Sequence, residues 1–186
     1  MSVGKGVDEV KQGLMRDALP TKDQVTMADE LTQAVRSAIE DRAAYLYLLL
    51  QEMRAANGAQ AAVEMARRAV FRYGQLKGRA LPPMLSPVDF IRHQMRPGRQ
   101  AIFEKEVVEE CPERCELRFH YCPLVQAWQR LGASEEELAQ LCDIAMAGDH
   151  GMVSETPFEL QVAGSLAKGD SCCRLILQPR NDAHAG

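Results

Sequence analysis

The feature that most constrains the fold is a change in the spacing of apolar residues along this 186-residue chain. Over 26–57 and 59–75, apolar residues recur about every three or four positions, which predicts two long helices. Over 115–121 and 156–167 they recur at every second position, which predicts half-buried strands. Because the helices come first and the strands are joined by turns rather than crossovers, we expect an α+β fold with an antiparallel sheet.

Local signals set the expected boundaries. Asn57-Gly58 closes the first helix, and the short connection predicts that the two helices form an antiparallel pair that packs on the sheet. The chain has the length of one ordinary domain. We therefore expect a single domain over 26–178, preceded by a flexible leader over 1–25 and followed by a disordered tail over 179–186.

The second half of the chain supplies the expected sheet. A short helix over 87–95 precedes it, and Lys168-Gly169-Asp170 is interpreted as the turn of a C-terminal β-hairpin. The expected strands are 105–111, 115–121, 156–167 and 172–178.

Composition and charge exclude several classes of protein. The net charge is −4 and there is no dense run of Lys or Arg, so we expect no nucleic-acid partner. No apolar stretch is long enough to span a membrane, and the N-terminal residues lack the apolar centre of a secretory signal. We therefore expect a cytoplasmic protein with no membrane partner, whose six cysteines are reduced.

Cys122 is the cysteine with the clearest chemical setting. No C-x-x-C pair exists, which argues against a zinc ribbon or a thioredoxin-type site. Cys122 directly precedes Pro123 and is expected to cap a helix, where amide groups and the helix dipole lower the pKa of a thiol. His120 leaves an extended segment on the same side and could accept the proton. The alternative is a buried small residue at a strand–helix junction.

Three other residues are expected near Cys122. Cys142 and Asp149 are two helical turns apart and share a face, with Asp149-His150-Gly151 marking the expected helix end. Cys173 lies on the apolar face of the last strand. We therefore predict that Cys122, Cys142, Asp149 and Cys173 converge on one pocket. The alternative is a set of core cysteines beside a surface carboxylate.

An ordered set of short motifs resembles a known enzyme family. The motifs are Arg68-Ala69-Val70 with Gly74, Tyr121-Cys122-Pro123, Trp128 with Gly132, Leu141-Cys142 with Asp149, and Leu166-Ala167-Lys168-Gly169-Asp170 followed by Cys173. They resemble the L-2-amino-thiazoline-4-carboxylic acid hydrolase family over roughly residues 40–177. The chain departs from the family pattern at Leu175, where an aromatic residue is common, and in its doubled Cys172-Cys173.

The resemblance implies a hydrolase that acts on carbon–nitrogen bonds other than peptide bonds and opens a cyclic C=N or amide bond in a small heterocyclic acid. In one mechanism the Cys122 thiolate attacks the ring carbon, and Asp149 or His120 moves the proton. Cys142, Cys173 and Trp128 then contact the substrate. In the other mechanism there is a cofactor, a single zinc held by Cys122, Cys142, Cys173 and Asp149, which activates water.

Some alternatives stay open at this stage. The Gly-Asp-x-x-Cys motif is also similar to one in 4-vinyl reductase domains, so a small-molecule-binding or sensor module without catalysis is the competing interpretation. A small-molecule substrate is the expected partner. The sequence does not distinguish a monomer from a homo-oligomer, identify the substrate, or say whether Cys172 or Cys173 faces the site.

Overall fold

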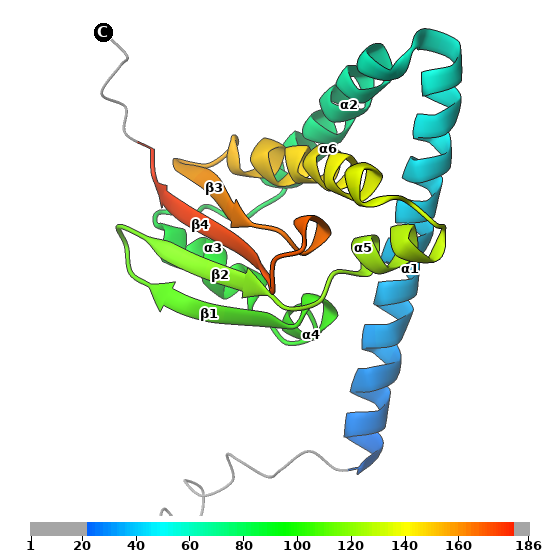
Figure 1. The fold of residues 1–186 in the computed structure, drawn as a ribbon. Helices are drawn as coiled ribbons and strands as arrows, with labels where there is room; N and C mark the ends of the chain where they lie inside the picture. The colour runs from blue at the N-terminus through cyan, green and yellow to red at the C-terminus, as the bar shows by residue number, and fades with distance from the viewer. Residues whose placement is uncertain (1–21, 181–186) are drawn as a thin grey trace, which may run out of the picture.

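The computed structural model describes residues 22–180, which form helices followed by one sheet (Figure 1). Most of the predicted leader and tail therefore lies outside the described residues. The elements are α1 (Lys22–Asn57), α2 (Ala59–Arg79), α3 (Pro87–Gln94), α4 (Gln100–Phe103), β1 (Lys105–Glu110), β2 (Cys115–Phe119), α5 (Pro123–Arg130), α6 (Glu135–Val153), β3 (Phe158–Gly164), the 3₁₀ turn η1 (Leu166–Lys168) and β4 (Cys173–Pro179).

The sheet is antiparallel throughout and has the strand order β1-β2-β4-β3. Because side chains alternate between the two faces of a strand, Leu117, Leu175 and Leu177 lie on the same face of the sheet. On that face Phe90 and Ile91 of α3 belong to the same apolar core as Leu117 and Leu177. The α+β class, the antiparallel sheet and the C-terminal pairing of β3 with β4 are thus confirmed. No helix among residues 22–180 is long and apolar enough to cross a membrane.

Helix α6 lies between α2 and the sheet, so the N-terminal helix pair reaches the sheet largely through other helices (Figure 1). The two helices diverge from their tight turn. Helix α1 packs on α5, where Trp128 Nε1 donates to the Ala43 carbonyl at 2.9 Å. Helix α2 packs on α6 so closely that a Cβ added to Gly74 would come within 2.0 Å of the Gly148 carbonyl oxygen.

Several predicted boundaries are wrong. Helix α1 begins at Lys22 rather than at residue 26, and α2 ends at Arg79 rather than at residue 75. Helix α6 continues through Gly151 to Val153. Gly151 allows the backbones of α6 and α2 to approach closely, because a Cβ at this position would lie 2.1 Å from the Phe71 carbonyl oxygen of α2. The link between β3 and β4 is longer than a tight turn, because η1 intervenes and the Asp170 carboxylate accepts a bond from the Ser165 amide at 2.7 Å.

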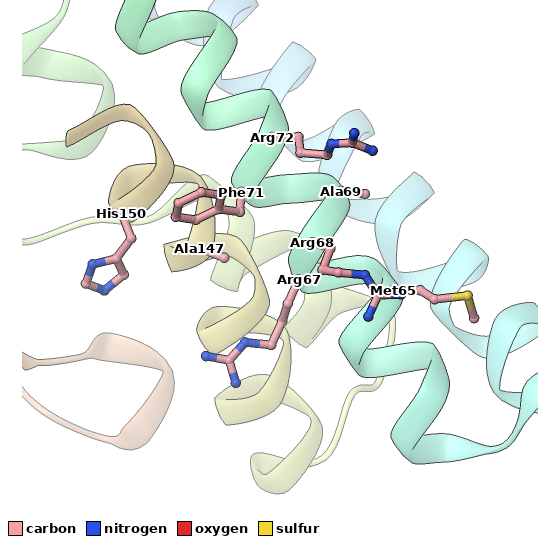
Figure 2. A pocket seen from close by; sticks show the side chains of 8 residues that line it. All are labelled: Met65, Arg67, Arg68, Ala69, Phe71, Arg72, Ala147 and His150. Atoms are coloured by element: carbon pink, nitrogen blue, oxygen red, sulfur yellow. The ribbon is translucent and has the colours of Figure 1, made fainter. Parts of the chain in front are cut away.

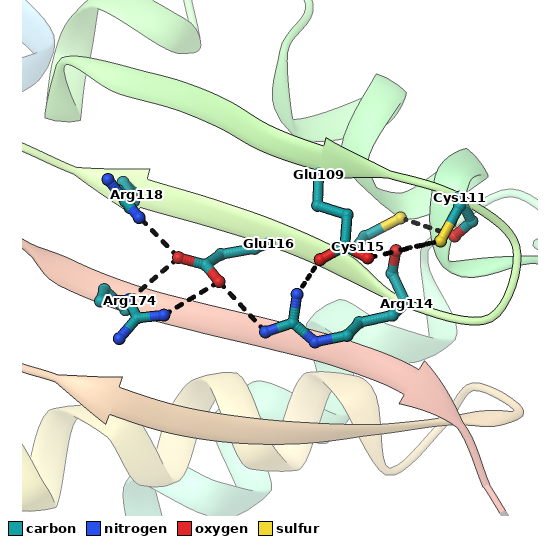
Figure 3. Close-up of polar contacts among 7 residues, drawn as sticks. All are labelled: Glu109, Cys111, Arg114, Cys115, Glu116, Arg118 and Arg174. Atoms are coloured by element: carbon teal, nitrogen blue, oxygen red, sulfur yellow. Dashed lines mark hydrogen bonds and ion pairs between the residues drawn. The ribbon is translucent and has the colours of Figure 1, made fainter.

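The opposite face of the sheet carries a carboxylate held by three arginines (Figure 3). The Glu116 side chain is only 5% exposed, and it accepts hydrogen bonds from Arg174, Arg118 and Arg114. These bonds hold the pKa of Glu116 at about 2, with the bonds from Arg174 contributing most. The arginine side chains cover the carboxylate, which explains how a charged residue is buried on a face that no helix of the described chain covers in Figure 1.

Candidate functional site

The N-terminus of α5 holds Cys122 as expected, but the thiol is not activated. Cys122 is the N-cap and Pro123 is the first helical residue. The amides of Leu124 and Val125 face the sulfur and lower its pKa, yet burial outweighs them and raises the pKa to about 12. The low pKa expected from the sequence is therefore wrong. The stabilisation of the thiolate by two amides of a short helix is smaller than the free-energy cost of removing the thiolate from water.

The structure brings Cys142 and Cys173 next to Cys122. Burial raises the pKa of all three thiols. The charges of Cys173 and Cys142 further disfavour ionisation of Cys122, and the charge of Cys142 disfavours that of Cys173. Cys142 Sγ lies 3.3 Å from Ser165 Oγ, and the Leu166 amide donates to Cys173 Sγ at 3.4 Å. Among residues 27–180, no three His, Cys, Asp or Glu side chains are grouped so as to hold a metal ion.

His120 and Trp128 have other partners. His120 Nε2 shares a hydrogen bond of 2.8 Å with Glu106 Oε2 at the exposed edge of the sheet. No hydrogen bond joins His120 to Cys122 in the described part of the chain. Trp128 is 1% exposed and packs in the core between α1 and α6, so it has no free surface for a ligand in this conformation.

Asp149 lies over the inner face of the sheet, at a small internal cavity of about 20 Å³. Among the described residues that line the cavity, Asp149 alone is ionisable. The other lining residues are Phe90, Gln94, Leu117, Phe119, Met152, Val153, Leu160, Leu175 and Leu177. Asp149 is half-buried, and its partial removal from water by these side chains raises the pKa of its carboxyl group, which makes no hydrogen bond within residues 27–180. A raised pKa makes the neutral, proton-donating form of a carboxyl group more available.

The strand register joins this cavity to the thiols. Phe119, which lines the cavity, pairs directly with Cys173 on β4 and with Lys105 on β1. Directly opposite residues in a sheet share a face, so a lysine, a phenylalanine and a cysteine form one row beneath α6. The cavity and the thiol group are therefore two parts of one region, with Asp149 above the row.

Lys105 was not singled out from the sequence. It is 7% exposed, and its Nζ donates to the Gln94 carbonyl at 3.3 Å and to Gln94 Oε1 at 2.9 Å. Burial lowers the pKa of Lys105 to about 8. The signal that could have revealed it is the period of β1, because Lys105 shares the inward face with Val107.

A much larger groove of about 710 Å³ lies on the surface between α2 and α6 (Figure 2). It is lined by Met65, Arg67, Arg68, Ala69, Phe71, Arg72, Ala147 and His150. Figure 2 shows Arg67 and Arg72 pointing away from one another. Among these residues the groove has no carboxyl group or thiol, and His150 is its one acid–base group, so nucleophilic chemistry is better placed at the internal cavity.

Comparison with known proteins gives one family. The sequence model described as L-2-amino-thiazoline-4-carboxylic acid hydrolase matches residues 36–177. That range includes the thiols, Asp149, Lys105 and all four strands up to Leu177. A comparison with individual curated proteins gave no match.

Proposed function

Because the chain belongs to the L-2-amino-thiazoline-4-carboxylic acid hydrolase family, we propose that it hydrolyses a carbon–nitrogen bond in the ring of a small heterocyclic acid. We place the reaction at the internal cavity beneath α6. The 2-amino-thiazoline-4-carboxylate named by the family is the first substrate to try.

The observation that carries this proposal is the setting of Asp149. Its carboxyl group stands in an otherwise uncharged wall, and burial raises its pKa. General acids in hydrolases need such a raised pKa, because the neutral carboxyl group must supply a proton at neutral pH. The charges of Lys77, His150 and Lys105, in that order, only partly oppose this effect.

The proposed reaction begins with neutral Asp149, which donates its proton to the ring nitrogen as water adds to the carbon of the C=N bond. The Asp149 carboxylate then removes the extra proton from the added water. In the second step the bond from that carbon to the ring nitrogen breaks. Asp149 gives the nitrogen a proton and receives the one released when the carbonyl group forms, so the acid is restored.

The cavity must widen to admit a substrate. About 20 Å³ is room for roughly one water molecule and not for a ring. Met152 and Gln94 line the cavity, and both have long side chains with several rotatable bonds. We propose that these two side chains move aside when substrate enters.

The thiols define two variants of the mechanism. In the first, Cys122 or Cys173 replaces water as the nucleophile; the raised pKa values require that a base take the thiol proton during attack. In the second, Cys122, Cys142, Cys173 and Asp149 would hold a zinc ion, which would supply an activated water. Metal analysis of the purified protein, repeated with Cys142→Ser, tests this variant, since a stoichiometric zinc lost in Cys142→Ser would support it.

The deciding experiment measures turnover of 2-amino-thiazoline-4-carboxylate by Asp149→Asn. We expect kcat to fall by about 10²–10⁴-fold, the usual contribution of a general acid. Asp143→Asn is the matched control, because Asp143 is on the same helix and forms an exposed ion pair with Lys168. Turnover by Asp149→Asn at the parent rate would refute the role of Asp149.

Two further results separate the alternatives. If Cys122→Ser and Cys173→Ser each turn over at the parent rate, water rather than either thiol is the nucleophile. If the parent protein binds the thiazoline without any turnover, the protein is a binding module of the kind that the Gly-Asp-x-x-Cys motif also suggests.

A further inference from the structure

Two basic side chains on the inner side of the sheet are buried and form no ion pair among residues 27–180. Lys105 is 7% exposed and His93 is 9% exposed. No carboxylate oxygen lies within 4 Å of Lys105 Nζ among residues 27–180, and its two acceptors both belong to Gln94. A buried ammonium group without a counter-ion costs several kcal/mol, so an unpaired lysine in a core usually has a function.

The second basic side chain, His93, lacks a hydrogen-bond acceptor. Arg99 Nη1 lies 2.8 Å from His93 Nε2, and because a guanidinium group can only donate, Nε2 must accept. The remaining ring proton is then on Nδ1, which is buried and has no hydrogen-bond partner. The charges of Arg99, Arg96 and Lys105 all act on His93, so the region is basic as well as short of acceptors.

The surroundings of Lys105 suit a small planar acid. Its Nζ lies 5.3 Å from the centre of the Phe119 ring and 5.7 Å from that of Phe103, within the range of cation–π attraction. Phe119 and Gln94 both line the cavity beside Asp149. The neutral oxygen of Gln94 thus occupies the position on Lys105 that a ligand oxygen would take.

We propose that Lys105 and Gln94 form the subsite for the carboxylate of the ligand. When the ligand binds, the hydrogen bond from Lys105 Nζ to the Gln94 carboxamide oxygen breaks. This assignment rests on the proposed function for the identity of the ring. One carboxylate oxygen accepts from Lys105 Nζ, and the other accepts from Gln94 Nε2 after its side chain rotates. The ring then lies on Phe119.

The register sets the direction of the ligand. Neighbouring strands are about 4.8 Å apart, so the row from Lys105 through Phe119 to Cys173 spans about 10 Å. That span accommodates one five-membered ring with its carboxylate. The reactive bond of the ring therefore lies on the side of Cys173 and beneath Asp149, away from Lys105.

The test measures equilibrium binding, so it does not depend on turnover. The probes are thiazolidine-4-carboxylate, whose saturated ring has no C=N bond to hydrolyse, and thiazolidine-4-carboxamide, which lacks the carboxylate. Calorimetry gives the Kd of each probe for the parent protein, Lys105→Met, Lys105→Arg and Arg92→Met. Arg92 is the matched control, because it lies on α3 as Gln94 does but is exposed and forms an ion pair with Glu110.

We expect Lys105→Met to weaken binding of the carboxylate by at least tenfold and to leave binding of the carboxamide within twofold. Lys105→Arg should restore part of the affinity, and Arg92→Met should change neither Kd. Equal loss of both probes, an unchanged Kd for the carboxylate, or no binding of the carboxylate by the parent would overturn the assignment. If Lys105→Met loses affinity only for the carboxylate probe but the parent protein does not hydrolyse the thiazoline, the subsite is supported and the hydrolase proposal is rejected.

Discussion

Replacing Lys105 with Met should stabilise the protein, because burying the charged lysine makes the free energy of folding less favourable. Burial lowers its pKa from 10.5 to about 8. A difference of about 2.5 between the two pKa values corresponds to about 3 kcal/mol of destabilisation when the lysine is protonated in both states. Methionine removes that cost but leaves the two Gln94 acceptors without their donor, which destabilises the variant by about 1 kcal/mol. We expect a net gain of about 2 kcal/mol at pH 7.

The pH dependence distinguishes this cause from better packing. In the parent protein the cost is fully present below pH 8 and disappears as the pH rises from about 8 to 10.5, because Lys105 loses its proton first in the folded state. Urea denaturation at pH 7 and pH 10 measures the difference, and at pH 7 a Tm increase of about 4–8 °C should accompany it. A destabilised Lys105→Met at pH 7, or an equal gain at both pH values, would refute the reasoning.

The remaining predictions concern other parts of the fold. Gly151→Ala should destabilise the protein by about 3 kcal/mol or more in urea denaturation, because the new Cβ overlaps a carbonyl oxygen of α2, whereas Gly148→Ala meets a movable side chain at 3.3 Å and should cost much less. Glu116→Gln should lower stability at pH 7, and the difference should shrink as the pH falls from about 4.5 through 2, where the parent Glu116 becomes protonated. Alkylation at pH 7.5 followed by mass spectrometry should modify Cys111, in the link between β1 and β2, before Cys122, because burial raises the pKa of the Cys122 thiol; faster labelling of Cys122 would contradict the raised pKa.

Features with local signals were predicted well. Cys122-Pro123 at the start of α5 follows from neighbouring residues and forms as expected. The capping box of Ser134 and Glu137 at the start of α6 is equally local. Alternation over 115–121 located β2 to within two residues. Such features need no partner from elsewhere in the chain, because the cap, the turn and the strand period are properties of short segments.

Gly151 illustrates where local reasoning failed. A glycine after His150 is a usual sign of a helix end, but here it lets the backbones of α2 and α6 approach. The same sequence signal serves both purposes. Only the position of α2, which is distant in the sequence, distinguishes them.

The sequence by itself determined the α+β class, the antiparallel strands, the helix cap at Cys122 and the family. It also identified the thiols and Asp149 as the groups to examine. The tertiary structure decided their chemistry, because the ionisation of a side chain depends on the water and charges that distant segments remove or supply. Burial by α6 and the sheet raised the pKa of Cys122, gave Asp149 an apolar wall, and left Lys105 without a counter-ion.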